Sequence, residues 1–496
     1  MLRMLSIAVV GLVILAAGLY SSGYRLERDG SGKLPRFVTK PDYDTLEADR
    51  ARQRQTPEAD SITAPASGAA PPSAAVDTAP QDSGTAGQRS TASAPTASAP
   101  TATDSSAPGR SWTNFRGENR DGRYTATSIR TTWPREGLPQ LWKQPVGGGY
   151  ASFVVANGRA FTIEQRRHQE VVAAYDVKTG REVWTNAWTA SFEESMGGDG
   201  PRATPTYHEG RIYALGAEGE LRVLDAAKGT LVWRRNILTE NRASNLSWGM
   251  SASPLIVDDK VIVLPGGTRG SSIVAYNKAT GDPVWKSLDD VQGYTSPMLV
   301  TLDGVRQILV VSATRAMGVT VDAGQLLWEY PWKTYSGINV AQPIVFQQNG
   351  NDRVFLSASY GTGAAVFELT RSGEGFQTKK VWENQRMKNK FSSSVFHNGF
   401  IYGLDESILA CIDANTGEQQ WKGGRYGYGQ ILLAGDHVIV LTEDGEVVLV
   451  KATSARHEEV AKFPAISGKT WNHPVIADGR LLVRNIQEMA AFDITD

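Results

Sequence analysis

Short runs of alternating apolar and polar residues fill the chain from about residue 111 onward. In one form, two apolar runs flank a short polar turn, as at 153–162 around Asn157-Gly158. In the other, an apolar run leads through a turn containing Asp and Gly into a run that ends in Trp, as at 174–184. Alternation between turn signals predicts antiparallel strands, and the two forms in succession predict units of four strands.

The second form recurs at a nearly constant spacing. Its closing aromatic residues lie 39 to 54 residues apart, which is about the period of propeller blades. A four-stranded sheet of this size cannot bury its own apolar faces, so the units are expected to stack around an axis, with one ring filling each wedge between blades. These structural docking residues are Trp142, Trp184, Trp233, Trp285, Trp328, Trp382, Trp421 and Phe463.

The two ends of the series predict how the ring closes. The last unit, from Pro474 to Ile494, contains three predicted strands, whereas Trp142 ends a strand that has no unit before it. One missing strand and one surplus strand match, so residues 140–142 are expected to complete the last blade and remove its free edge. The prediction is an all-β, eight-bladed propeller of four-stranded antiparallel blades over residues 111–496, closed by strands from both ends.

The first 110 residues have a different character. Residues 4–24 carry no formal charge and are long enough to span a bilayer or to act as a secretory signal, so 1–28 are predicted to be a hydrophobic helix of one of these kinds. Residues 29–110 are predicted to be a disordered linker, because 61–110 are mainly Ala, Pro, Ser and Thr and cannot form a core. Within the linker we expect at most a brief helix over 44–54.

Two motifs resemble a known family. The pattern Ala-x-Asp-x-x-Thr-Gly-x-x-x-Trp is complete at 174–184, and it has one extra residue before the Asp at 410–421. It is similar to the tryptophan-docking repeat of propellers of the pyrroloquinoline-quinone (PQQ) type. Residues 112–117 and 119–122 resemble the opening segment of the bacterial quinone-like repeat proteins. The resemblance covers about 111–496, and it includes both outer-membrane assembly factors and quinoprotein dehydrogenases.

The charges beside the apolar segment leave its orientation open. Arg3 precedes it and several cations, beginning with Arg25 and Arg28, follow it, so the positive-inside rule alone would keep the propeller in the cytoplasm. Long domains translocate with limited regard for such charges, and the resemblance implies the opposite side. We expect a periplasmic or otherwise extracytoplasmic propeller that is tethered to the inner membrane or secreted. No cysteine ends the segment, which excludes a lipoprotein anchor.

The loops that enter the innermost strands of a propeller surround one mouth of its channel. In this chain those loops combine aromatic, acidic and basic residues, so a peptide or a small ligand could bind where stacking surfaces and charged donors converge. Solvated loops with Gly chosen for turns are the simpler alternative. The candidate rim residues are Glu193, Glu194, Asp199, Arg202, Trp248, Tyr294, Tyr335, Asn339, Lys388, Lys390, Tyr428, Trp471 and His473.

Catalytic chemistry receives little support from the residues, and we assign no catalytic residue. The resemblance implies paired cysteines, calcium ligands and an Asp base for a quinone enzyme, but Cys411 is the single cysteine and no compact calcium motif is present. The six histidines show no pair at metal-ligand spacing. We predict no metal and no cofactor, with PQQ and Ca²⁺ as the alternative. A net charge of −1 without a long basic run argues against nucleic acid.

These observations favour a non-catalytic binding or scaffold platform in the bacterial cell envelope. Its partner is expected to be an envelope protein or a small ligand at the funnel, and its N-terminal segment is expected to contact the membrane. The alternative is a PQQ-dependent oxidoreductase, similar to an alcohol dehydrogenase, with a divergent site. Polysaccharide recognition is a third reading, because Trp248, Tyr294, Tyr335 and Trp471 could stack on sugars.

Overall fold

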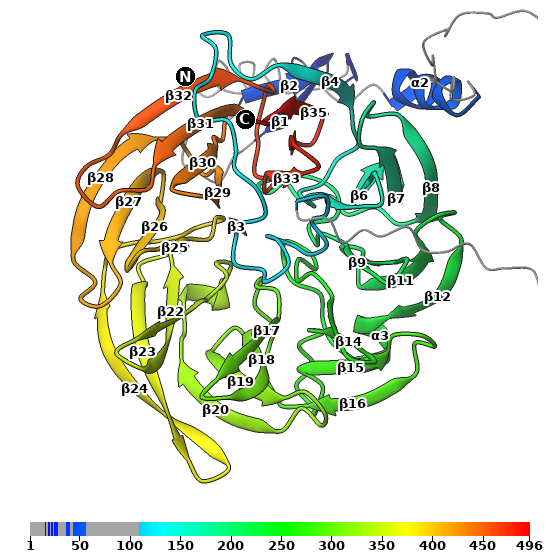
Figure 1. The fold of residues 1–496 in the computed structure, drawn as a ribbon. Coiled ribbons are helices and arrows are strands. Elements are labelled where there is room, and N and C mark those ends of the chain that lie inside the picture. Colours follow the sequence, from blue (N-terminus) through cyan, green and yellow to red (C-terminus); the bar gives the residue numbers. More distant parts are fainter. Residues whose placement is uncertain are drawn as a thin grey trace, which may run out of the picture.

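Eight β-sheets surround a central axis as radial blades (Figure 1). The computed structural model describes residues 109–496 and, before them, residues 15, 18–19, 21–22, 24–27, 36–39 and 43–55. In seven blades, four strands that follow one another in the sequence are neighbours in the sheet. The predicted all-β, eight-bladed propeller is therefore confirmed.

Blades 1 to 4 follow in chain order. Blade 1 contains β5 (Val154–Ala156), β6 (Arg159–Arg166), β7 (Gln169–Asp176) and β8 (Glu182–Thr189). Blade 2 contains β9 (Thr206–His208), β10 (Arg211–Leu215), β11 (Glu220–Asp225) and β12 (Leu231–Asn236). Blade 3 contains β13 (Leu255–Val257), β14 (Lys260–Val263), β15 (Ile273–Asn277) and β16 (Pro283–Ser287). Blade 4 contains β17 (Met298–Leu302), β18 (Val305–Val311), β19 (Arg315–Thr320) and β20 (Leu326–Pro331).

Blades 5 to 8 complete the ring. Blade 5 contains β21 (Ile344–Gln348), β22 (Asn351–Ala358), β23 (Gly363–Ser372) and β24 (Gly375–Asn384). Blade 6 contains β25 (Val395–His397), β26 (Phe400–Asp405), β27 (Ile408–Asp413) and β28 (Gln419–Arg425). Blade 7 contains β29 (Gln430–Ala434), β30 (His437–Leu441), β31 (Glu446–Lys451) and β32 (Glu459–Pro464). Blade 8 contains β33 (Val475–Ala477), β34 (Arg480–Arg484), β35 (Glu488–Asp493) and β4 (Gln140–Pro145).

Blade 8 joins the two ends of the propeller. β4 pairs antiparallel with β35, and Trp142 lies opposite Ala491 in the register. The last strand of this blade thus comes from the start of the propeller, as the strand count predicts. A short strand that the sequence pattern does not predict, β3 (Arg123–Tyr124), pairs in parallel with β29 and gives blade 7 a fifth strand.

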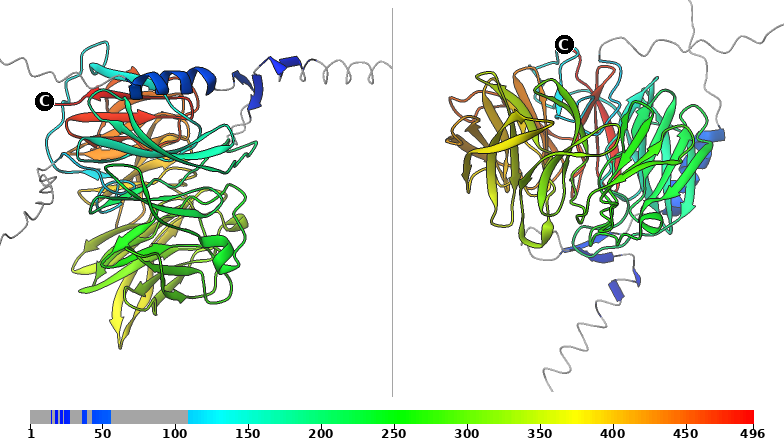
Figure 2. Two further views of the ribbon diagram at one scale, coloured as in Figure 1. Left: turned by 90° about the vertical axis from the view of Figure 1, so that its right-hand side faces the viewer. Right: turned by 90° about the horizontal axis from the view of Figure 1, so that it is seen from below.

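The docking tryptophans contact the turn of the next blade. Six of them donate the indole N–H to a backbone carbonyl there, at 2.7–3.1 Å. Trp328 differs, since it donates to the Gln307 side chain of its own blade at 2.5 Å. The reason lies in blade 5, where the long β23–β24 hairpin replaces the short turn and projects beyond the other blades (Figures 1 and 2).

The Asp-x-x-Thr-Gly turn is the receiving half of this contact. In blade 1, Asp176 Oδ1 accepts the backbone N–H groups of Lys178 and Thr179 at 3.0 and 2.8 Å, which closes the turn. Gly180 then lies beneath the Trp142 ring with φ +69°, and a Cβ atom on it would lie 2.6 Å from ring carbons. The motif recurs because each copy must form a turn and also leave room for an indole.

We expect Gly180→Ala to destabilise the propeller by about 2–4 kcal/mol, because the new methyl group meets the Trp142 ring in addition to straining the backbone. Gly158→Ala is the matched control: its φ is +71°, but a Cβ atom there meets nothing within 4 Å. Gly158→Ala should be destabilised only by the strain of its backbone conformation, by about 1–2 kcal/mol. Urea unfolding of both variants measures the difference, and equal losses would show that the ring contact contributes nothing.

Few helices accompany the strands. Before the propeller, β1 (Tyr24–Glu27) pairs with β2 (Arg36–Thr39), and α2 (Tyr43–Gln55) confirms the brief helix expected over 44–54. Within the propeller are α3 (Ile237–Asn241) and the 3₁₀ turn η1 (Tyr335–Gly337). None of the helices in the described residues is long and apolar enough to cross a bilayer. Most of the predicted hydrophobic segment 4–24, and residues 56–108 of the predicted linker, lie outside the described residues.

Candidate functional site

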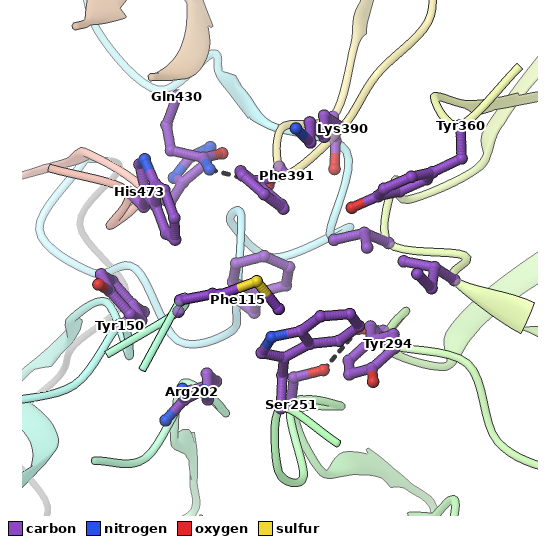
Figure 3. Close-up of a pocket in the computed structure, with 17 residues that line it drawn as sticks. Phe115, Tyr150, Arg202, Ser251, Tyr294, Tyr360, Lys390, Phe391, Gln430 and His473 are labelled. Atoms are coloured by element: carbon purple, nitrogen blue, oxygen red, sulfur yellow. Dashed lines mark hydrogen bonds between the residues drawn. The ribbon is translucent and has the colours of Figure 1, made fainter. Parts of the chain in front are cut away.

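The loops before the innermost strands meet at the axis and enclose a cavity of about 360 Å³ (Figure 3). This volume is within the range of small-molecule sites. Much of the wall is aromatic, and the rings come from loops of different blades, so the cavity exists only in the closed ring. Its seven Phe, Tyr and Trp residues are Phe115, Tyr150, Trp248, Tyr294, Tyr360, Phe391 and Trp471.

Packing among these rings holds them in place before any ligand binds. Trp471 lies 5.2 Å from the Tyr150 ring and 4.6 Å from the Phe391 ring, and Trp248 lies 5.9 Å from the Tyr294 ring, all between centroids. Burial raises the pKa of Tyr294 to about 12, so its hydroxyl stays neutral at physiological pH. A wall of this kind loses little conformational freedom when a ligand binds.

Basic side chains also line the aromatic cavity. Arg202 and Lys390 line the cavity, and none of the described residues that line it is Asp or Glu. Lys390 Nζ lies 4.5 Å from the centroid of the Tyr428 ring, and Lys469 Nζ lies 4.5 Å from the centroid of the Trp471 ring. An aromatic face attracts a cation through the partial negative charge of the ring. The site therefore offers apolar surface together with positive charge.

Arg202 is fixed by its own loop. Its guanidinium donates to the carbonyls of Gly198, at 2.5 Å, and Gly200, and lies 4.6 Å from the centroid of the Phe192 ring. Burial lowers the pKa of Arg202, while Tyr150 and Glu194 act in the opposite direction. The Glu194 carboxylate accepts the N–H of Met196 at 3.0 Å and also that of Gly197, so it shapes the loop.

His473 is a neutral member of the wall. Its imidazole is buried, stacks on Trp112 at 6.3 Å, and meets the Phe115 ring edge-on at 6.0 Å. Burial, and then the nearby charge of Arg116, hold its pKa well below the ordinary value. Among the described residues, no group of three or more His, Cys, Asp or Glu side chains is placed to bind a metal.

Residues 112–122, here called the axial segment, cross the centre of the ring (Figure 1). Their backbone pairs with Val155 of blade 1 through Trp112, and the Gly122 carbonyl accepts from Leu433 of blade 7 at 2.9 Å. Phe115 of this segment lines the cavity and is central among its side chains in Figure 3. The axial segment thus forms part of the cavity wall.

Two buried arginines attach the axial segment to the blades. Arg120 donates to the carbonyls of Ser253 and Pro297, both at 3.0 Å, and to that of Pro254, which places its guanidinium between blades 3 and 4. Arg116 donates to the Ser394 carbonyl beside blade 6 at 2.9 Å. Burial lowers the pKa of Arg120 to about 9 and that of Arg116 to about 10, so both remain charged at neutral pH.

The structure brings together six of the thirteen candidate rim residues. Those that line the cavity are Arg202, Trp248, Tyr294, Lys390, Trp471 and His473. The other seven do not line it, for different reasons. Tyr335 is 77% exposed, and Asn339 is buried, with its amide donating to the Ser312 carbonyl at 2.8 Å. Lys388 lies 4.0 Å from Asp405, and Tyr428 packs behind Phe391 at 5.5 Å. The acidic members that do not line the cavity are Glu193, Glu194 and Asp199.

Several lining residues are absent from the sequence-based candidates. Three of them lie in loops that the sequence places at the mouth, so their position in those loops could have identified them. They are Met196, Phe391 and Gln430. Phe115 and Tyr150 precede the innermost strand of blade 1 and have no place in the repeat pattern. Tyr360 follows β22, and no feature of the sequence distinguishes it from a surface tyrosine.

The single cysteine lies away from the cavity. Cys411 is in β27, fully buried among apolar side chains, and it does not line the cavity. Burial raises the pKa of its thiol to about 12, which keeps it protonated and unreactive. Cys411 is therefore a small residue of the apolar core.

The sequence is similar to two groups of known proteins, outer membrane assembly factors and alcohol dehydrogenases. A model of the family described as outer membrane protein assembly factor BamB matches residues 167–423, more than half of the chain. BamB of Burkholderia pseudomallei is 24% identical over 384 residues, which cover 66% of this chain and 92% of that protein. A 1-butanol dehydrogenase (cytochrome c) of Thauera butanivorans is 25% identical, over 33% of this chain and 24% of that protein.

Solved structures give the same two groups. The quinohemoprotein alcohol dehydrogenase of Comamonas testosteroni superposes with a TM-score of 0.57 at 16% identity, covering 77% of this chain and 80% of that one. BamB of Moraxella catarrhalis superposes with a TM-score of 0.52 at 15% identity, covering 72% of this chain and all of that one. At these identities the likeness concerns the fold alone. With the family model matched and the docking repeat and ring closure in place, the chain belongs to the PQQ-like propeller family of the outer membrane protein assembly factor BamB.

Proposed function

We propose that this propeller is a non-catalytic binding platform of the bacterial cell envelope, and that a partner protein places an apolar segment in the axial cavity. The observation that carries the proposal is the cavity itself, in which seven aromatic rings and two cations converge without a lining carboxylate. Buried aromatic and arginine residues are the usual energetic centre of protein interfaces. A partner segment with an aromatic or aliphatic side chain next to an acidic group matches this wall best.

The extent of the sequence matches supports the same choice. The match to the assembly factor of Burkholderia pseudomallei spans 92% of that protein, whereas the match to the Thauera butanivorans dehydrogenase spans 24% of it. The second match covers 33% of this chain, a length that a few blade repeats would account for. The first compares nearly whole propellers, and the function of a platform needs little more than a propeller and its loops.

The quinoprotein alternative can be compared with the residues present. Ca²⁺ takes six to eight oxygen ligands, but no Asp or Glu lines the cavity among the described residues. The resemblance also implies paired cysteines beside the quinone, whereas the thiol of Cys411 is buried in blade 6. The aromatic and cationic wall could accept a flat anion, but the lining residues do not fit a quinone held with calcium. We therefore assign no chemical step to the site.

Cross-linking at the mouth tests the platform directly. A photo-reactive amino acid at position 335, which is exposed in the turn η1 just before the lining residue Ile338, should yield a specific adduct with an envelope protein in intact cells. The same group at position 284, exposed on the outer strand β16, is the control and should not. Because Trp248 and Trp471 would be central contacts, Trp248→Ala combined with Trp471→Ala should lower the adduct yield at least about tenfold.

Equal adducts from both positions, or an adduct unaffected by the double variant, would contradict the proposal. Two further measurements separate the alternatives. Saturable binding of PQQ with Ca²⁺, followed by quinone absorbance and accompanied by alcohol oxidation, would favour the dehydrogenase. Binding on a glycan array that is lost in Trp248→Ala would favour polysaccharide recognition.

We further propose that residues 1–28 are a signal peptide or a membrane anchor, that 29–110 are chiefly a linker, and that the propeller is extracytoplasmic. The composition of these segments supports the first two parts of the proposal, and the similarity to outer membrane assembly factors supports the third. Position 335 offers a test, because a cysteine in place of the exposed Tyr335 should react with a membrane-impermeant maleimide once the outer membrane is permeabilised. Protection of that cysteine until the inner membrane is broken would place the propeller in the cytoplasm.

A further inference from the structure

The flank of blade 1 contains a buried cluster of charged groups, none of which lines the axial cavity. Arg166 Nε lies 2.6 Å from Glu164 Oε1, and Arg166 Nη2 lies 2.6 Å from Glu182 Oε2. The Tyr175 hydroxyl donates to Glu164 Oε1 at 3.0 Å. Both carboxylate side chains are fully buried. We call Glu164, Arg166, Tyr175 and Glu182 the flank site.

The helix α2 inserts an arginine into this cluster. Arg50 is fully buried, donates to the Pro145 carbonyl at the end of β4, and has its guanidinium carbon 5.1 Å from the centroid of the Tyr175 ring. Its Nε lies 4.0 Å from Glu182 Oε2. Burial alone would raise the pKa of Glu164, but Arg166, Arg484 and Arg50 hold it below its ordinary value. The flank site therefore receives the arginine of α2 as one of its compensating cations.

Other side chains of α2 fix the register of the helix. Gln53 Oε1 accepts the Glu182 N–H at 3.1 Å, and Gln53 Nε2 lies 3.3 Å from the Gln144 side-chain oxygen of β4. Glu47 pairs with Arg166 at 3.2 Å. The helix thus contacts both β4 of blade 8 and β8 of blade 1, at the place where the ring closes.

α2 has little reason to be helical by itself. Its sequence, YDTLEADRARQRQ, contains Leu46 as its one large aliphatic residue, and an isolated helix of 13 residues is marginal in water. Leu46 and Arg50 lie one turn apart and are both buried in the complete chain, at 4% and 0% exposure. Its stability must come from docking. Figures 1 and 2 show α2 at the outer edge of the ring, away from the axis.

We propose that the flank site is a binding site for an arginine-bearing helix, and that α2 is its occupant, forming a strap that fastens the N-terminal part of the chain to blades 1 and 8. The site is separate from the axial cavity, so this inference does not depend on the proposed function. The strap leaves the axial mouth open for a partner. It also holds blade 1 and blade 8 together from outside.

Docking of α2 shortens the stretch of chain between the apolar segment and the propeller. Without the strap, residues 25–108 separate the apolar segment from the propeller, and with it the separation is residues 25–42. The strap therefore keeps blade 1 close to the N-terminal segment and limits how the propeller can turn.

Hydrogen–deuterium exchange of the full-length protein tests the strap. Arg50→Ala should speed exchange of the α2 amides at least about tenfold, because α2 undocks and water hydrates the flank site. It should leave β19 of blade 4, on the opposite side of the ring, unchanged. Arg52→Ala is the matched control on the same helix, since the Arg52 side chain is 70% exposed and pairs with Asp49 of the same helix at 3.2 Å. It should leave exchange of α2 unchanged. Unchanged exchange in Arg50→Ala, or an unprotected α2 in the unmodified protein, would overturn the proposal.

Two further measurements test the strap, and the first does not depend on the folding of Arg50→Ala. With Arg50 present, a short bismaleimide cross-linker should join Gln53→Cys to Gln144→Cys in high yield, because the two glutamine side chains meet at 3.3 Å. It should not join Gln53→Cys to Gln325→Cys, on the exposed turn before β20. A synthetic peptide of residues 43–55 should bind folded Arg50→Ala protein, and the same peptide with Arg50→Ala should bind at least about tenfold more weakly. Absence of the first cross-link, or equal binding of the two peptides, would also overturn the proposal.

Discussion

Replacing Arg120 by Met is expected to destabilise the propeller by about 3–5 kcal/mol, because it removes the guanidinium that joins the axial segment to blades 3 and 4. The carbonyls of Ser253 and Pro297 each accept one of its hydrogen bonds at 3.0 Å. Both acceptors are buried at the axis, and a methionine cannot donate to them. An acceptor left unpaired in such a place costs about 1–3 kcal/mol.

The control for this prediction is Arg123→Met. Arg123 is three residues further along, in β3, and its side chain is exposed, so its loss should change stability by less than about 0.5 kcal/mol. Urea unfolding of both variants, followed by tryptophan fluorescence, measures the difference. If the two variants unfold at the same urea concentration, the axial segment is not held by Arg120.

The blade repeat was predictable because its signals are local. The strand that contains Trp184 and the turn at Asp176 each follow from a few neighbouring residues. The closure by β4 followed from counting strands. The five-stranded form of blade 7 could not be predicted, because β3 has two residues and no period. The docking of α2 could not be predicted either, because the burial of Arg50 depends on carboxylates more than a hundred residues away.

The candidate site divides in the same way. Trp248 and Trp471 were found because the loops that carry them must surround a mouth in any propeller. Sequence alone could not show that Glu194 folds back onto its own loop, since the carboxylate is held by backbone N–H groups of Met196 and Gly197. Phe115 was missed because the path of the axial segment through the ring is a property of the assembled fold.

Trp142→Ala is expected to cost about 3–5 kcal/mol and to weaken the closure of the ring. Trp142 is 6% exposed, donates its indole N–H to the Val177 carbonyl at 3.0 Å, and covers Gly180. It lies in β4, the strand that completes blade 8, and no continuous backbone links β4 to its neighbour β35. Removing the indole therefore removes packing between blades 8 and 1 and also weakens the pairing of β4 with β35.

Leu141→Ala provides the control, because Leu141 is the preceding residue of the same strand but is 44% exposed on its outer side. Its loss should cost less than about 1 kcal/mol, since an exposed side chain gains little from burial. Exchange of the β35 amides should also rise in Trp142→Ala, because β4 covers the edge of β35. Equal stability of the two variants, with β35 protected in both, would mean that the ring is held closed by contacts other than the docking of this tryptophan.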